Sequence, residues 1–191
     1  FRFDAKARAE IRLALGVGEG QFLVGCVGSM IEAKNHMRAL SVFAELKRRK
    51  PSAYLLVLGD GGLRGTLEVE AARLGLSSSV AMPGFVDDAY RWYSAIDVLL
   101  FPSLYEGLPI ALVEAQCNGL PVVCSDAVTE EVVLLESFRR LPLSAPDAEW
   151  VSSLLSAERD TTGAAAETVR AKGFDRNDTA RMLLEIYRGE P

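Results

Sequence analysis

The sequence lacks any long hydrophobic run and has few cysteines. No apolar stretch reaches the roughly 18 to 20 residues that a membrane-spanning helix needs, and no basic segment followed by an apolar core marks a secretion signal. The three cysteines, Cys26, Cys117 and Cys124, show no CxxC spacing and are odd in number. We therefore expect free, mostly buried thiols in a reducing compartment, with the cytoplasm as the default location.

A basic excess is also absent, because the formal net charge is −5 and the sequence pI is about 5.1. Nucleic acids and anionic membranes attract basic proteins, so neither is expected as the main partner. A small phosphorylated ligand stays compatible with this charge. With 191 residues, 49% of them hydrophobic and 25% charged, the chain predicts one soluble domain over residues 1–191. It begins without methionine, which indicates a piece of a longer protein.

The sequence shows no group of possible metal ligands at a suggestive spacing. His36 is the only histidine, and we expect it to be solvated or capping and assign it no role. Asp87 and Asp88 adjoin in one loop, but no further acidic residue or histidine stands at a suggestive spacing. We expect Asp60, Asp87 and Asp88 to cap turns or helices. The sequence therefore predicts no metal site.

Short apolar runs alternate with amphipathic segments along the chain. Continuous apolar runs indicate strands buried on both faces, and they cover residues 22–27, 54–58, 80–82, 98–101 and 122–124. Helical patterns cover residues 5–15, 37–44, 63–74 and 175–187, and loops are expected around Pro142, Pro146 and residues 161–166. This alternation predicts an α/β fold with a doubly wound, Rossmann-like parallel sheet. Its core would span about residues 22–126, followed by C-terminal helices over about 146–188.

The segment from Glu106 to Glu114 follows the fourth strand and begins a helix. Pro109 suits the first helical position, and the unpaired amides of that turn, at the positive end of the helix dipole, suit a diphosphate. Gly107 lets a ligand approach the backbone. Glu114 lies roughly 7.5 Å further along the axis, within reach of a ribose, and hydroxyls are also the partners expected for the carboxylate of Glu106. The glutamate spacing alone favours a simpler interpretation, a helix start with Glu114 on a solvated face.

Two other loops at the same edge of the sheet add candidate groups. Lys34 follows the first strand and can neutralise a diphosphate as a point charge. A solvated surface lysine is an equally compatible interpretation. The backbone of Phe85 and Val86, after the third strand, can pair with the edge of a base.

In combination these segments resemble one family, the GT-B-fold retaining glycosyltransferases of family four (glycosyl transferases group 1), and within it the C-terminal donor-binding domain of the exopolysaccharide-synthesis type. The resemblance covers about residues 22–126 and is carried by Val27-Gly28, Lys34-Asn35-His36, Leu58-Gly59-Asp60-Gly61, Gly84-Phe85-Val86-Asp87-Asp88, Asp97-Val98, Pro102-Ser103-Leu104-Tyr105-Glu106-Gly107-Leu108-Pro109, Glu114-Ala115 and Gly119-Leu120-Pro121-Val122-Val123. It implies that Lys34 contacts the donor diphosphate and Glu106 the transferred sugar. These two would be the catalytic residues.

The resemblance also implies the rest of a nucleotide-sugar site. Val86 would contact the base and Glu114 the ribose hydroxyls, and the remaining donor-binding positions are Gly28, Ser29, Phe85, Ser103, Gly107, Leu108 and Pro109. A UDP-sugar is expected rather than a GDP-sugar, without a metal or other cofactor. The transferred sugar would keep its anomeric configuration.

Two departures from the family pattern limit what this chain is expected to do alone. Ser29 stands where the family commonly has an arginine, so stabilisation of the leaving diphosphate depends more on Lys34. A GT-B enzyme has two Rossmann-like domains, and an N-terminal acceptor domain is absent from this chain. We therefore expect the isolated domain to bind a donor without transferring its sugar, and the helix at 175–187 to lack a packing partner. Any association with the inner face of a membrane would involve the absent part.

Three other functions remain as alternatives. A GT-B-fold epimerase of UDP-sugars predicts acids and bases around the sugar ring, of which only Glu106 is evident. A non-catalytic domain of the same ancestry, which senses sugar nucleotides or docks to a synthesis complex, would account for Ser29. A receiver-like signalling domain needs an acidic pair after the first strand, where this chain has Gly28-Ser29.

Overall fold

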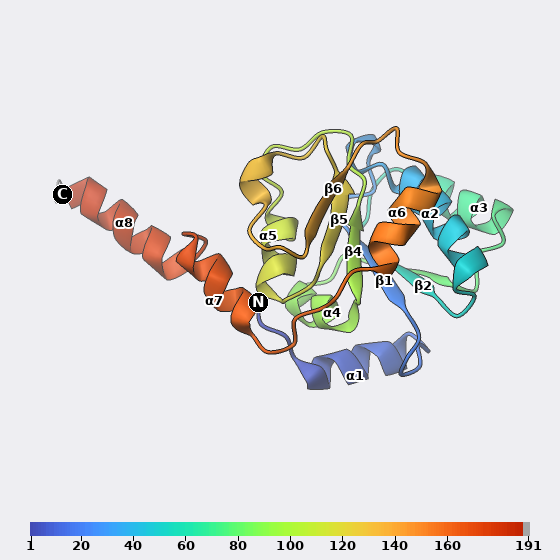
Figure 1. The fold of residues 1–191 in the computed structure, drawn as a ribbon, viewed down its shortest axis with the longest axis horizontal. Coiled ribbons are helices and arrows are strands. Elements are labelled where there is room, and N and C mark those ends of the chain that lie inside the picture. Colours follow the sequence, from blue (N-terminus) through green and yellow to red (C-terminus); the bar gives the residue numbers. More distant parts are fainter. Residues whose placement is uncertain (189–191) are drawn as a thin grey trace.

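Six parallel strands form one sheet in the order β3-β2-β1-β4-β5-β6 (Figure 1). The computed structural model describes residues 1–188. Its strands are β1 (Leu23–Val27), β2 (Tyr54–Leu58), β3 (Val80–Gly84), β4 (Val98–Phe101), β5 (Val122–Ser125) and β6 (Phe138–Leu141). The predicted Rossmann-like α/β fold is confirmed.

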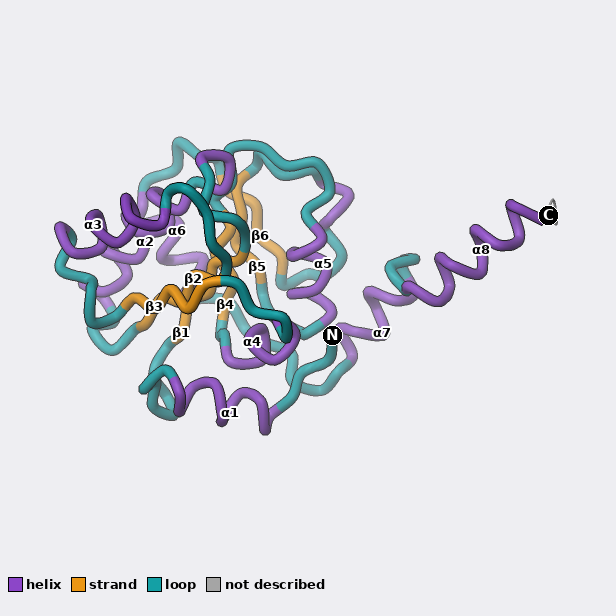
Figure 2. The backbone as a smooth tube through the Cα atoms, turned by 180° about the vertical axis from the view of Figure 1, so that it is seen from behind, coloured by secondary structure: helices purple, strands orange, loops and turns teal. Residues whose placement is uncertain are grey.

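Helices cover both faces of this sheet (Figure 2). They are α1 (Ala5–Ala14), α2 (His36–Arg49), α3 (Arg64–Arg73), α4 (Ala89–Ala95), α5 (Ile110–Cys117), α6 (Asp147–Leu155), α7 (Ala164–Ala171) and α8 (Arg176–Arg188), with 3-10 turns η1 (Glu32–Lys34) and η2 (Glu130–Val132). Side chains of α2, α3 and α6 pack on one face, and side chains of α1, α4 and α5 belong to the core of the other. Each face of the sheet is therefore closed by its own helical layer.

Successive side chains of each apolar run point to opposite faces of the sheet, so they enter two different hydrophobic clusters in turn. In β2, Leu55 and Val57 pack against α2 and α3, while Leu56 and Leu58 pack in the opposite cluster. All four are almost fully buried. A strand covered on both faces needs apolar residues at consecutive positions, which is the pattern that the sequence shows.

Two elements after residue 126 differ from the expectation. The structure has a strand, β6, at one edge of the sheet, where no apolar run indicated one. The expected loop over 161–166 is shorter than predicted, because α7 already begins at Ala164. Buried side chains continue to Trp150 and Val169, so the core is longer than the expected 22–126. The predicted free cysteines are confirmed, with Cys26 and Cys124 buried.

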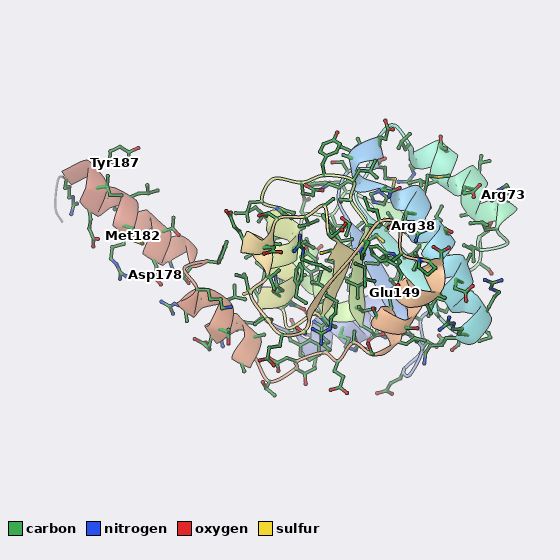
Figure 3. All side chains as sticks on the ribbon, turned by 45° about the horizontal axis from the view of Figure 1, so that its top comes forward. Arg38, Arg73, Glu149, Asp178, Met182 and Tyr187 are labelled. Carbon is green, nitrogen blue, oxygen red and sulfur yellow. The ribbon has the colours of Figure 1, made fainter. Side chains whose placement is uncertain are left out.

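The last helix, α8, extends away from the sheet (Figures 1 and 2). It forms where a helix over 175–187 was expected, and its large apolar side chains, among them Met182 and Tyr187, are exposed (Figure 3). Across residues 1–188, no helix has both the length and the apolar character that crossing a membrane requires.

Candidate functional site

The carboxyl ends of β1 and β4 lie side by side at the point where the strand order reverses. From β1 the chain continues outward to β2 and β3, and it then returns to the opposite side of β1 as β4. The loops that follow β1 and β4 therefore leave toward different faces, which opens the sheet edge where ligands of such folds bind. Both loops carry a predicted site residue, Lys34 and Glu106.

Lys34 and Glu106 form an ion pair at this edge. The Lys34 Nζ lies 2.6 Å from Glu106 Oε1, and both side chains are largely buried, with 20% and 14% of their surface exposed. The Lys34 ammonium also lies 4.9 Å from the centre of the Phe101 ring, a cation–π contact. The interpretation of Lys34 as a solvated surface lysine is therefore wrong.

Two backbone segments are joined beneath this ion pair. Asn35 has a φ of 51°, the left-handed region that asparagine tolerates better than most residues, and its side-chain amide donates to the Pro102 carbonyl at 3.0 Å. The Leu104 amide donates to the Ala33 carbonyl at 2.8 Å. These bonds hold the loop of Lys34 against the loop of Glu106. An asparagine between a strand and a helix is a sequence signal for a turn. Nothing in the neighbouring residues indicates that its side chain bonds Pro102.

The loop before α5 contains the other predicted groups of this edge. Ser103 is 1% exposed, and its Oγ has no hydrogen-bond partner among residues 1–188, while its carbonyl accepts from Ser125 Oγ at 2.5 Å. A Cβ added at Gly107 would have no atom within 4 Å. Leu108 is exposed.

The helix α5 begins one residue later than expected. Pro109, predicted as the first helical residue, is the N-cap with ψ of 99°, and α5 starts at Ile110 without a side-chain cap. The Leu112 amide donates to the Pro109 carbonyl at 2.9 Å. Because no side chain caps the first turn, the amides of Ile110 and Ala111 remain suited to an anion.

Glu114 lies in α5 and is half-buried rather than on a solvated face. Its Oε2 accepts a hydrogen bond from the Tyr93 hydroxyl at 3.0 Å. Burial raises the pKa of Glu114, and the Tyr93 bond partly offsets that effect. Tyr93 was not predicted, because it lies 21 residues away on another helix.

The loops after β1 and β2 pack backbone against backbone. Gly59 has a φ of +129°, and a Cβ added there would lie 2.2 Å from the Gly28 carbonyl oxygen. The Met30 amide donates to the Asp60 carbonyl at 2.9 Å. Gly28, a predicted donor-binding residue, lies beside Lys34, since a Cβ added at Gly28 would lie 3.0 Å from Lys34 Cε. Ser29 is exposed in this loop.

The loop after β3 holds Phe85 and Val86. Phe85 is 79% exposed, and Val86 packs partly against the core. The end of β3 lies beside the end of β2, since the Gly59 amide donates to the Gly84 carbonyl at 3.0 Å. This loop therefore flanks the glycine loops rather than the ion pair itself.

The predicted capping aspartates take different roles. The Asp60 carboxylate accepts from the next backbone amide, that of Gly61, which is a turn role as expected. Asp88 is the N-cap residue of α4 but makes no side-chain cap; its carboxylate accepts instead from Trp92 Nε1 at 3.0 Å. In residues 1–188 no three His, Cys, Asp or Glu side chains gather as metal ligands would.

His36 is buried, so the expectation of a solvated or capping histidine is wrong. It is 5% exposed, and its Nδ1 has no hydrogen-bond partner in the described part of the chain. Burial, and then the nearby charge of Lys34, lower the pKa of His36 to about 4. The imidazole is therefore neutral at pH 7. It borders a small cavity also lined by Lys34, Phe101 and Pro102.

A parallel sheet covered by helices on both faces, with a strand-order switch point between β1 and β4, defines a Rossmann-like α/β domain. The chain belongs to the glycosyl transferases group 1, because the model of that family matches residues 7–155.

Relatives in this family resemble almost the whole chain. It is 36% identical to the "Putative glycosyltransferase EpsF" of Bacillus subtilis (strain 168), over 98% of this chain and 50% of that protein. It is 30% identical to the "D-inositol 3-phosphate glycosyltransferase" of Corynebacterium urealyticum, over 97% of this chain and 47% of that protein. The chain thus spans about half the length of the curated relatives it matches.

Solved structures of GT-B glycosyltransferases share the fold. A crystal structure of Anabaena Alr3699/HepE in complex with UDP and glucose has a TM-score of 0.81 and 21% identity, over 99% of this chain and 54% of that one. WaaG, a glycosyltransferase involved in lipopolysaccharide biosynthesis, has a TM-score of 0.76 and 24% identity, over 96% of this chain and 51% of that one. At these identities the likeness concerns the fold alone.

Proposed function

We propose that this chain is the donor-binding, C-terminal domain of a retaining glycosyltransferase that uses a nucleotide-diphosphate sugar. The observation that carries the proposal is the Lys34–Glu106 pair at the switch point, beside the uncapped start of α5. It places one cation, one carboxylate and a set of free amides on the same sheet edge. A diphosphate attached to a sugar presents the complementary set of charges and hydroxyls.

Each group has a role that its chemistry suits. Lys34 and the first-turn amides of α5 compensate the negative charge of the diphosphate, and they stabilise it as it leaves. Glu106 accepts hydrogen bonds from hydroxyls of the transferred sugar, and Glu114 from hydroxyls of the ribose. In this proposal Lys34 and α5, rather than a bound metal, balance the charge of the donor.

The relatives support a choice of base and of biological setting. The HepE structure contains UDP and glucose, and the structure of a pneumococcal O-GlcNAc transferase contains UDP and GlcNAc. These complexes support a UDP-sugar over a GDP-sugar, with the loop of Phe85 and Val86 beside the base. The similarity to EpsF supports a role in exopolysaccharide or other cell-surface polysaccharide synthesis. A second domain would have to supply the acceptor.

Calorimetric titration of this chain with UDP, GDP and UDP-glucose tests the proposal. We expect UDP and UDP-glucose to bind and GDP to bind more weakly. A Lys34→Ala change should weaken UDP binding about 10- to 100-fold, since a hydrogen bond to a charged group contributes roughly 1.5–3 kcal/mol. Binding of none of the three ligands would refute the proposal.

A matched control separates site chemistry from general charge. Lys6, on α1 at the other end of the sheet, has an 86% exposed side chain. Lys6→Ala removes the same charge, so we expect unchanged UDP affinity. Equal effects of Lys6→Ala and Lys34→Ala would remove Lys34 from the site.

One observation favours a second function, a non-catalytic domain that senses sugar nucleotides. Ser29 is exposed and uncharged at the loop that faces the diphosphate in this proposal, so the site holds one cation fewer than the family pattern implies. Sugar transfer by the longer protein, abolished by Glu106→Ala, would argue against a sensor. Tight UDP binding without transfer would favour it.

A further inference from the structure

Tyr93 is the largest buried residue near the proposed ribose site that has no role so far. It lies on α4 and is fully buried, with its hydroxyl 3.0 Å from Oε2 of Glu114 on α5. Burial and the charge of Glu114 raise the pKa of Tyr93. The phenol therefore stays protonated and donates the hydrogen bond, and the carboxylate accepts it.

Glu114 depends on this one donor. Within residues 1–188, the Tyr93 hydroxyl is the only side-chain group that hydrogen-bonds Glu114. The charge of the Phe1 amino group also lowers the pKa of Glu114, and it stays in place in a Tyr93 variant. The bond occupies Oε2 and leaves Oε1 for another partner. A carboxylate held at one oxygen keeps a fixed direction for the other, which is how a supporting residue orients a binding group.

Tyr93 is itself fixed by distant parts of the chain. The Phe1 ring packs edge-on against the Tyr93 ring, with centroids 6.0 Å apart. The Arg159 guanidinium donates to the Tyr93 backbone carbonyl at 3.1 Å. These contacts restrain the ring and the backbone of Tyr93. The hydroxyl is therefore held in position to donate to Glu114.

We propose that Tyr93 is a positioning residue for ribose recognition, which holds Glu114 with one carboxylate oxygen aimed at the ribose hydroxyls. The inference rests on the proposed donor-binding function. It assigns to the Tyr93–Glu114 pair the distinction between a ribonucleotide and a deoxyribonucleotide. A carboxylate held in position favours the nucleotide that has the 2′-hydroxyl, because it accepts a hydrogen bond from that group. This difference in affinity is lost when the carboxylate is free to turn.

The test compares UDP with 2′-deoxy-UDP by calorimetry on wild type and Tyr93→Phe, which removes only the hydroxyl. Wild type should prefer UDP by about tenfold. In Tyr93→Phe, UDP should bind roughly 3- to 10-fold more weakly, while 2′-deoxy-UDP, which keeps only the 3′-hydroxyl, should lose less affinity, so the preference shrinks. Loss of the Tyr93 hydroxyl also raises the pKa of Glu114. As pH falls, the Tyr93→Phe variant should therefore begin to lose affinity for UDP at a higher pH than wild type does.

Tyr90→Phe is the matched control. Tyr90 lies on the same helix, its ring also contacts Phe1, with centroids 6.5 Å apart, and it is 46% exposed. Its loss of a hydroxyl should leave the preference for UDP unchanged. Glu114→Asp is a second variant that keeps Tyr93: its shorter side chain cannot reach both the phenol and the ribose, so it should lose the preference as well.

The outcomes separate this inference from the proposed function. No UDP binding by wild type overturns both. If wild type binds UDP, three results overturn the positioning role alone: no preference for UDP over 2′-deoxy-UDP, an unchanged preference in Tyr93→Phe or Glu114→Asp, or an equal loss of both nucleotides in Tyr93→Phe. The last result would mean that the hydroxyl serves only the packing of α4 on α5. A preference lost in Tyr93→Phe and kept in Tyr90→Phe supports the inference.

Discussion

Lys34 Nζ lies 2.6 Å from Glu106 Oε1, so the two charged residues proposed to bind the donor form an ion pair with each other. The pair satisfies a cation and an anion that are both largely buried, so neither charge is left unpaired at the sheet edge. A diphosphate would bring its own negative charge to Lys34 and would compete with Glu106 for it. The proposed function therefore predicts an exchange of partners on donor binding, in which Glu106 turns from the lysine to the hydroxyls of the sugar.

Glu106→Gln should strengthen the binding of UDP, which has no sugar for Glu106 to contact. The neutral amide no longer competes for Lys34 and no longer repels the diphosphate, so we expect affinity for UDP to rise about 3- to 10-fold. Titration calorimetry on the variant measures this. Glu32→Gln is the control, because it removes the same charge from an exposed position two residues before Lys34. Weaker UDP binding in Glu106→Gln would contradict the exchange of partners.

Gly59→Ala should destabilise the protein strongly. The residue has a left-handed φ of +129°, and the new Cβ would overlap the Gly28 carbonyl oxygen at 2.2 Å. We expect the free energy of unfolding to fall by about 3 kcal/mol or more, measured by urea denaturation. Gly65→Ala, in α3 with no atom within 4 Å of its Cβ, should instead stabilise by roughly 0.5–1 kcal/mol. A small loss in Gly59→Ala would mean that the two loops separate easily.

The strands at the centre of the sheet could be predicted because burial on both faces leaves a local record. β1, β2, β4 and β5 are covered by helices on each side, so their residues are apolar apart from the glycine of β1 and the final serine of β5. β6 lies at one of the two edges of the sheet and has the sequence Phe138-Arg139-Arg140-Leu141. Arg140 extends to Glu130 and to the carbonyls of Asp126 and Val128. An edge strand can hold such side chains at its margin, and the apolar pattern then disappears.

The place of the candidate residues in the fold could be predicted where they follow strand ends directly. The loop from Ser103 to Pro109 and Lys34 were expected at one edge of the sheet from strand ends and helix starts, which are local features. The Tyr93–Glu114 bond and the burial of His36 depend on how separate helices pack. Nothing in the neighbouring residues records such contacts, so a single sequence gave no signal for them.

His36 should make the protein less stable in acid. Its folded-state pKa of about 4 lies below the ordinary 6.5, so the unfolded chain takes up a proton first as pH falls. The neutral, buried imidazole makes its full contribution to the free energy of unfolding above pH 6.5, and this contribution is lost as pH falls toward about 4. The loss amounts to roughly 2 kcal/mol between about pH 7.5 and pH 5. Urea denaturation at both pH values, on wild type and His36→Gln, isolates this term, since the opposite effect of the raised Glu114 pKa is common to both proteins. An equal pH dependence in the two proteins would show that His36 takes up its proton in the folded state as easily as in the unfolded chain.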